Sequence, residues 1–172
     1  MARLIEIKAH CHDWDAMNSR LSGMTTAPSA DIQQDDTFFA CANGRLKLRE
    51  LAPDRGRLIF YRRSDGAGAK QTDFLVSKTD SPASLRECLA LAHGVIGRVR
   101  KARTIFELPA ARVHLDRVAG LGSFVEIEVL MEDGVDAARG EAVISLLMSA
   151  LSIETDDLLS GSYLDLLATH SD

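Results

Sequence analysis

The feature that most restricts the fold is an alternation of apolar and polar residues that recurs in eight segments of the sequence. In an extended strand, successive side chains point to opposite faces, so this alternation predicts strands with one apolar face and one polar face. The segments are 3–10, 35–41, 44–51, 56–63, 71–77, 97–107, 111–118 and 123–131. Gly, Pro, Asn or Asp bounds most of them, and Asn43-Gly44 predicts a tight turn between two.

Apolar residues at helical spacing occur in fewer segments than the alternation that predicts strands. Ser81 as N-cap and Pro82 at the first helical position predict the start of a helix that ends before Gly94. The predicted helices are 12–22, 82–93 and 136–151, with short helical turns near the end of the chain and loops at 23–34 and 64–70. Eight mostly antiparallel strands with few helices predict an α+β fold built on a large curved sheet or a closed barrel.

Length and charge narrow the class of protein. A chain of 172 residues fits one domain over 1–172, and its 46% hydrophobic content without a long apolar tract predicts a soluble protein. No signal peptide is evident, and the three scattered cysteines favour a reducing, cytoplasmic location. The net charge of −5 argues against a general nucleic-acid or membrane surface, so any anion site must be local.

The polar faces of the predicted strands are sorted by charge. The basic residues on these faces are Lys8, Arg45, Lys47, Arg49, Arg63, Lys101 and Arg103, and the acidic residues are Glu6, Asp116, Glu126 and Glu128. A solvent-facing sheet also alternates, but it normally mixes charges of both signs, because like charges side by side repel. Segregation therefore favours a lined cavity for a polyanion, with carboxylates that hold a hard divalent cation.

Several motifs, in this order and spacing, resemble one family. They are "IEIKAH", "DDTFF", "GRLKLRE", "RKAR", "VHLDRVAGLGSFVEIEV" and "SGSYLDLL", and together they run nearly from end to end. The chain resembles the CYTH superfamily, or triphosphate tunnel metalloenzymes, which includes class IV adenylyl cyclases, thiamine triphosphatases and inorganic triphosphatases. The resemblance implies an eight-stranded antiparallel closed barrel, the triphosphate tunnel, with helices packed outside.

The resemblance also implies roles for the charged residues. Glu6, Glu126 and Glu128 would bind Mg²⁺ or Mn²⁺, with Asp116 assisting directly or through water. The phosphate oxygens would be bound by Lys8, Arg45, Lys47, Arg49, Arg63, Lys101 and Arg103. Catalysis would involve Lys8, Glu6 and Glu126.

Three departures from the family pattern are visible. Leu4 replaces the first Glu of the family's Glu-x-Glu-x-Lys signature, His10 replaces a basic residue, and "KQTDFLVS" lacks the Arg and Glu of many relatives.

The leading hypothesis is a metal-dependent phosphohydrolase acting on inorganic, nucleoside or thiamine triphosphate. A class IV adenylyl cyclase making cyclic AMP from ATP and a non-catalytic triphosphate or polyphosphate binder are the alternatives. The expected partner is a small-molecule triphosphate rather than a nucleic acid or a membrane, and a homodimer stays open.

Overall fold

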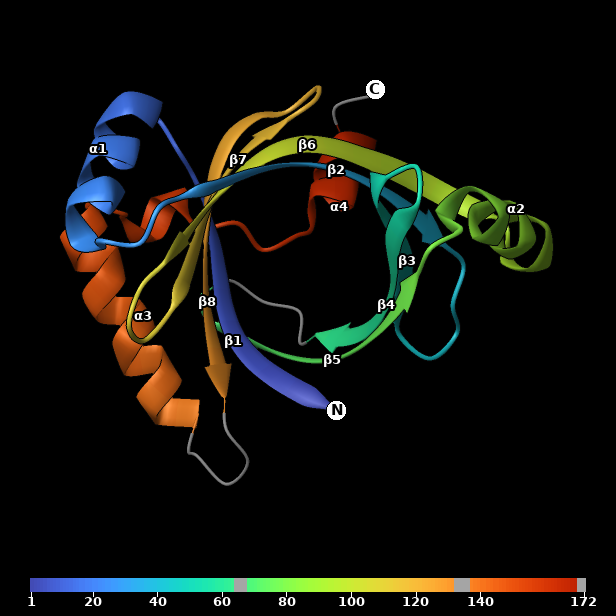
Figure 1. The fold of residues 1–172 in the computed structure, drawn as a ribbon. Helices are drawn as coiled ribbons and strands as arrows, with labels where there is room; N and C mark the ends of the chain where they lie inside the picture. The colour runs from blue at the N-terminus through green and yellow to red at the C-terminus, as the bar shows by residue number, and fades with distance from the viewer. Residues whose placement is uncertain (64–67, 132–136, 170–172) are drawn as a thin grey trace.

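The computed structural model describes residues 1–63, 68–131 and 137–169, and it shows a closed barrel of eight strands (Figure 1). The strands are β1 (Ala2–His10), β2 (Ala30–Phe39), β3 (Arg45–Ala52), β4 (Arg55–Arg63), β5 (Lys70–Thr79), β6 (Val95–Glu107), β7 (Arg112–Val118) and β8 (Gly122–Met131). Their order around the barrel is β1-β5-β4-β3-β2-β6-β7-β8, all neighbours are antiparallel, and β8 pairs back with β1. The predicted α+β fold with a closed antiparallel barrel is confirmed.

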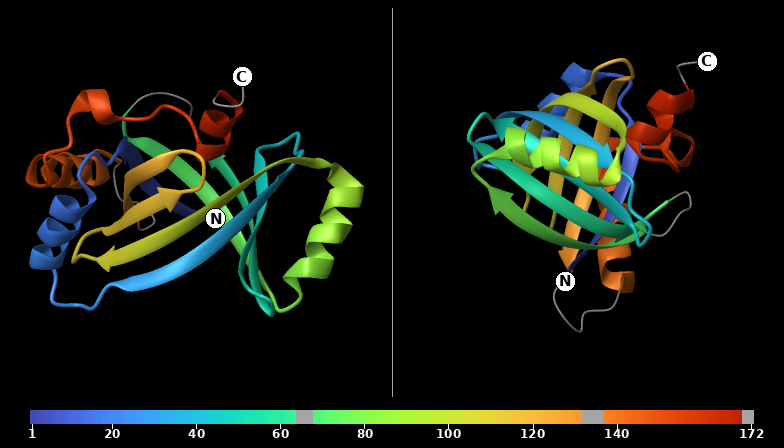
Figure 2. Two further views of the ribbon diagram at one scale, coloured as in Figure 1. Left: turned by 90° about the horizontal axis from the view of Figure 1, so that it is seen from above. Right: turned by 90° about the vertical axis from the view of Figure 1, so that its right-hand side faces the viewer.

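Helices cover two opposite sides of the barrel. They are α1 (Trp14–Met24), α2 (Pro82–His93), α3 (Ala137–Leu151) and α4 (Tyr163–Thr169), with a 3₁₀ turn η1 (Thr155–Asp157). Helices α1 and α3 lie together on one side, and α2 lies on the other (Figure 2). None of the helices in the described ranges combines the length and the apolar character that a bilayer span requires.

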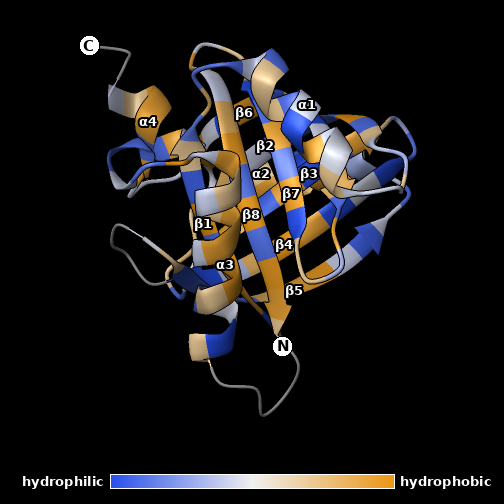
Figure 3. Ribbon diagram, turned by 90° about the vertical axis from the view of Figure 1, so that its left-hand side faces the viewer, coloured by the Kyte–Doolittle hydropathy of each residue, from blue (hydrophilic) through white to orange (hydrophobic). Residues whose placement is uncertain are grey.

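The main apolar core lies between the barrel wall and helices α1 and α3. Figure 3 views this side, where α3 lies over β1 and β8. Ile5 and Ile7 of β1, Ile127 of β8 and Ile144 of α3 are all at most 2% exposed. Each such side chain contributes on the order of 2 kcal/mol by leaving water. Because Ile5 and Ile7 point outward into this core, Glu6 and Lys8 between them point into the barrel.

A second apolar cluster packs inside the barrel. It consists of Phe38, Val99, Val118, Phe124 and, from α4, Tyr163. Tyr163 therefore reaches the barrel interior from outside the sheet, and it bounds the interior together with Phe38 and Val99.

One strand is longer than predicted. The segment 23–34 was expected to be a loop, but α1 continues to Met24 and β2 begins at Ala30. The stretch from Ala30 to Gln34 shows little apolar alternation, and its extended form comes from pairing with β6, in which Ala30 lies opposite Ile105. The predicted loop 64–70 ends one residue earlier than expected, because Lys70 is the first residue of β5. Residues 64–67 of this loop and residue 136, the predicted start of a helix, lie outside the described residues.

Candidate functional site

The barrel surrounds a cavity of about 770 Å³ that most of the charged strand faces line. Lys47 and Arg49 of β3 point into it while Leu48 between them is fully buried in the wall, as strand alternation requires. Among the described lining residues, nine are Lys or Arg and six are Asp or Glu. This local excess of positive charge, in a chain of net charge −5, suits an anionic ligand.

Asp36 of β2 organises the cations of β3. Its carboxylate accepts hydrogen bonds from Lys47 Nζ at 2.9 Å and from Arg49 Nε and Nη2 at 2.7 Å each. Burial by itself raises the pKa of Asp36, but the charges of Arg49 and Lys47 outweigh it and hold that pKa well below its usual range. Asp36 thus stays ionised and fixes the direction of both cationic side chains.

Asp116 of β7 holds the cationic side chains of β6 by hydrogen bonds, as Asp36 holds those of β3. It is 0% exposed and accepts hydrogen bonds from Lys101 Nζ at 3.0 Å, Arg103 Nε at 2.6 Å and the Tyr163 hydroxyl at 2.9 Å. Burial and the neighbouring Arg103 lower the pKa of Lys101 to about 7, although Glu126 and Asp116 act in the opposite direction. Lys101 therefore titrates close to neutral pH.

Glu126 of β8 lies at the centre of the cavity wall. Its Oε1 is 2.8 Å from Lys8 Nζ, and its Oε2 contacts Arg103 Nη2. Burial raises the pKa of Glu126, but the charges of Arg103, Lys8 and Lys101 hold it well below its usual range. The two buried carboxylates of Glu126 and Asp116 thus anchor the cations of β1 and β6.

The Arg63 side chain of β4 is buried, and two of its donors lack a partner among the described residues. Its Nη1 is 3.6 Å from Glu6 Oε1, which also accepts a hydrogen bond from Thr72 Oγ1 at 2.9 Å. Arg63 Nε and Nη2 find no hydrogen-bond partner among the described residues, although the side chain lines the cavity. Buried polar groups are nearly always hydrogen-bonded, so these two donors point to an anion that the cavity accepts.

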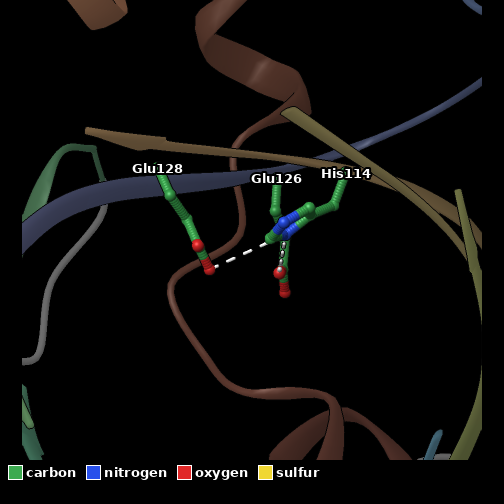
Figure 4. Close-up of side chains that lie close together, drawn as sticks. All are labelled: His114, Glu126 and Glu128. Carbon is green, nitrogen blue, oxygen red and sulfur yellow. Dashed lines mark ion pairs between the residues drawn. The ribbon is translucent and has the colours of Figure 1, made fainter. Parts of the chain in front are cut away.

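One group of side chains has the composition of a metal site. His114 of β7 and Glu126 and Glu128 of β8 each offer a ligand atom, and these atoms all lie within 4.8 Å of one another (Figure 4). The cross-strand pairing of His114 with Glu126 places them on the same face of the sheet. An imidazole nitrogen with two carboxylates is a donor set that divalent cations accept.

The structure brings most of the predicted site residues to one cavity. The lining includes Glu6, Lys8, Lys47, Arg49, Arg63, Lys101, Arg103, Glu126 and Glu128. Arg45 is outside this lining and pairs with Asp165 at 3.2 Å. Asp116 is also outside it, buried behind Lys101 and Arg103, and Glu6 is not in the compact group around His114.

Three residues with clear partners in this site are absent from the set of site residues predicted from the sequence. Asp36 stands within "DDTFF" and His114 is one polar residue of its strand face, whereas Tyr163 is expected from the sequence to pack or to close over the tunnel mouth. Their partners come from β3, β8 and β7, so only the pairing of distant segments reveals their roles.

Comparison with known proteins assigns the family. The CYTH domain model matches residues 2–163. The PH1012 protein of Pyrococcus horikoshii OT3 has a similar structure, with a TM-score of 0.84 and 21% identity over 97% of this chain and 99% of that chain. A candidate adenylate cyclase of Vibrio parahaemolyticus has a TM-score of 0.78 and 21% identity over 96% of this chain and 97% of that chain.

A more distant solved structure shares the same fold. It is a candidate adenylyl cyclase of Hippeastrum with a dominant triphosphatase activity, with a TM-score of 0.68 and 16% identity over 98% of this chain and 96% of that chain. The search of curated proteins finds no match to this sequence. Because the family model covers nearly the whole chain and the barrel has the same architecture as these structures, the protein belongs to the CYTH domain family.

Proposed function

We propose that this protein is a divalent-metal-dependent triphosphatase that binds its substrate in the barrel cavity. The observation that carries the proposal is Arg63, whose Nε and Nη2 are enclosed in a cationic cavity without a hydrogen-bond partner among the described residues. A phosphate oxygen would satisfy these donors, since a guanidinium matches the geometry of phosphate. Membership of the CYTH family supports the same class of substrate.

The cavity supplies what phosphoryl transfer needs from a protein. Phosphoryl transfer depends mainly on positioning and on charge stabilisation of the phosphate oxygens. Six of the nine described cations in the lining are also predicted from the sequence to bind phosphate, and they come from four strands: Lys8, Lys47, Arg49, Arg63, Lys101 and Arg103. Asp36 and Asp116 hold four of these cations by hydrogen bonds, so little rearrangement is needed when a chain of phosphates binds.

The acidic residues form the other half of the proposed site. Glu126 and Glu128, with Glu6 on the neighbouring strand, are the carboxylates proposed to hold Mg²⁺ or Mn²⁺. When bound, the cation supplies further neutralisation of the phosphate charge. Lys8 lies against Glu126 at 2.8 Å and is proposed to contact the phosphate that reacts. Arg45, which lies outside the cavity lining and pairs with Asp165, is proposed to contact the end of the substrate.

The test is an assay of the purified protein with inorganic triphosphate, ATP and thiamine triphosphate. Each substrate is incubated with Mg²⁺, with Mn²⁺ and with EDTA, and phosphate, pyrophosphate and cyclic AMP are measured separately. We expect metal-dependent phosphate release that falls at least 100-fold in Lys47→Ala and in Glu126→Gln. Arg98→Ala is the matched control, because Arg98 lies on the same strand as Lys101 but pairs with Asp35 outside the cavity.

Other outcomes separate the alternative functions. Cyclic AMP and pyrophosphate from ATP would assign the adenylyl cyclase function instead. Leu4, which lines the cavity where the family signature has Glu, favours the non-catalytic binder as the second candidate. Tight triphosphate binding without turnover on any substrate would assign that function, and full activity in both cavity variants would contradict the proposed site.

A further inference from the structure

His114 is placed to contact the same ion as the two carboxylates beside it. In the β7–β8 pairing His114 lies opposite Glu126, and Glu128 follows two positions later on the same strand face. The three side chains converge from two adjacent strands (Figure 4). This arrangement comes from the register of the barrel and needs no special loop, so its backbone frame is rigid.

The ring nitrogen of His114 that faces the carboxylates has no hydrogen bond to any residue that the structure describes. The His114 side chain is 4% exposed, with Nδ1 at 3.5 Å from Glu126 Oε2 and 3.7 Å from Glu128 Oε1. These distances bring Nδ1 close to both carboxylates, but Nδ1 makes no hydrogen bond within the described part of the chain. A buried ring nitrogen without a partner needs an explanation, and a cation between Nδ1 and the two carboxylates provides one.

We propose that His114 is a metal ligand through Nδ1, together with Glu126 and Glu128, so that the cavity prefers divalent transition metals to Mg²⁺. The inference rests on the proposed function only in placing the metal in the same cavity. Imidazole suits the later divalent transition metals such as Zn²⁺, and the affinity of a mixed nitrogen and oxygen site rises from Mn²⁺ to Co²⁺, whereas Mg²⁺ prefers a set made only of oxygen ligands. Leu4 strengthens this preference, because an apolar side chain lines the cavity where the family signature offers a further carboxylate.

The carboxylates can bind a cation without losing their present partners. Glu126 Oε2 already contacts Arg103, but each carboxylate oxygen has two lone pairs and accepts a second partner. Glu128 is partly exposed to the cavity, and its Oε1 is the oxygen that faces His114. Three protein ligands leave coordination positions open for phosphate oxygens or water.

The test measures metal binding directly, in the absence of any substrate. Mn²⁺ bound to the full chain is studied by pulsed electron paramagnetic resonance, which detects nitrogen coupled to the metal. Affinities for Mg²⁺, Mn²⁺ and Co²⁺ are measured by calorimetry. We expect a directly coordinated nitrogen in the wild type, tighter binding of Co²⁺ and Mn²⁺ than of Mg²⁺, and loss of the nitrogen signal in His114→Ala.

The size of the effect separates a ligand from a packing residue. His114→Ala is expected to weaken Co²⁺ binding at least tenfold while changing Mg²⁺ binding less than threefold. Glu128→Gln is expected to weaken the binding of both ions, since it removes a charged oxygen ligand. His114→Gln keeps a polar side chain of similar reach, so it provides a second variant in case the alanine variant does not fold.

The matched control removes a surface histidine. The rings of His10 and His12 lie 6.1 Å apart, the His12 side chain is 74% exposed, and such a pair can bind transition metals by itself. His12→Ala is expected to keep the nitrogen signal and the Co²⁺ affinity of the cavity site. A nitrogen signal that persists in the double variant His12→Ala/His114→Ala, equal affinity for Mg²⁺ and Co²⁺, or no metal binding at all would overturn the proposal. Because no substrate is present, a lack of triphosphatase activity leaves these results unaffected.

Discussion

At the scale of single residues, Asp36 sets the stability of the cavity wall. Asp36→Asn leaves Lys47 and Arg49 buried without their charged partner, and removing one member of a buried ion pair costs about 3–5 kcal/mol. We expect a decrease of this size in the free energy of unfolding at pH 7, measured by urea denaturation. Asp35→Asn is the matched control, because Asp35 pairs with the half-exposed Arg98, and such surface pairs contribute about 1 kcal/mol or less.

The carboxylate of Asp36 should also make the unfolding free energy depend on pH. The pKa of Asp36 in the folded protein lies well below that of an unfolded Asp, so on acidification the unfolded state takes up the proton first. The stability that Asp36 contributes is therefore fully present above about pH 4 and decreases as the pH falls below this value. Wild type and Asp36→Asn should then differ less in unfolding free energy at pH 3 than at pH 7. An equal difference at both values would mean that folding does not lower the pKa of Asp36.

We expect Arg63 to contribute to the affinity of the protein for triphosphate. Arg63→Lys keeps the charge but removes the planar donors that have no partner in the part of the chain that the structure describes, so we expect inorganic triphosphate to bind about 10- to 100-fold more weakly. Calorimetry with the free protein measures this directly. Arg62→Lys is the control, since Arg62 is the next residue, points outward and donates to the Asn43 carbonyl. Equal weakening in both variants would mean that Arg63 does not contact the phosphates.

Sequence periodicity shows which face a residue occupies, but it does not identify its partner. Lys47 and Glu126 were placed on the lining face because apolar neighbours on both sides fix their direction. The pairing of Asp36 with Arg49 and of His114 with Glu126 depends on which strands are neighbours and in which register. That information is spread over segments far apart in the chain, so these two roles needed the structure.

At the scale of elements, Gly140 lets α3 approach the barrel closely. A Cβ atom at this position would lie 2.8 Å from Met131 Sδ and 2.9 Å from Ile5 Cδ1. Gly140→Leu must therefore displace both side chains, and we expect it to destabilise the fold by roughly 1–3 kcal/mol. Thermal unfolding followed by circular dichroism tests this.

The control for this helix contact is a glycine in open space. A Cβ atom at Gly23, in the last turn of α1, meets nothing within 4 Å. Gly23→Leu is expected to leave stability unchanged or to raise it by up to about 1 kcal/mol, because leucine favours the helix. A comparable loss in both variants would assign the effect at Gly140 to helix chemistry rather than to packing.

The strands differ in how accurately their bounds can be predicted from the sequence. Strands such as β3 and β8 show strict alternation, and their predicted bounds fall within one residue of the structure. The first half of β2 has polar residues on both faces, and its extended form depends on the long partner β6. Alternation reports burial on one face, so it misses a strand that is defined mainly by backbone pairing.

At the scale of the whole molecule, charge is separated between the inside and the outside. The chain has a net charge of −5, yet the lining of its cavity has more cations than anions. The residues outside the cavity therefore carry a net negative charge, which does not favour contact with a large polyanion. Under the proposed function, we expect a small anion that fits in about 770 Å³ to bind and a nucleic-acid duplex not to bind.

This separation predicts which polyanions stabilise the fold. Inorganic triphosphate at 100 times its dissociation constant should add about 2.7 kcal/mol to the unfolding free energy. For a domain of this size that corresponds to a rise in Tm of roughly 5–11 °C. Duplex DNA at the same phosphate concentration should give no rise, and Lys47→Ala should reduce the effect of triphosphate. A similar rise with DNA would locate the anion site on the outer surface and would contradict a site inside the barrel.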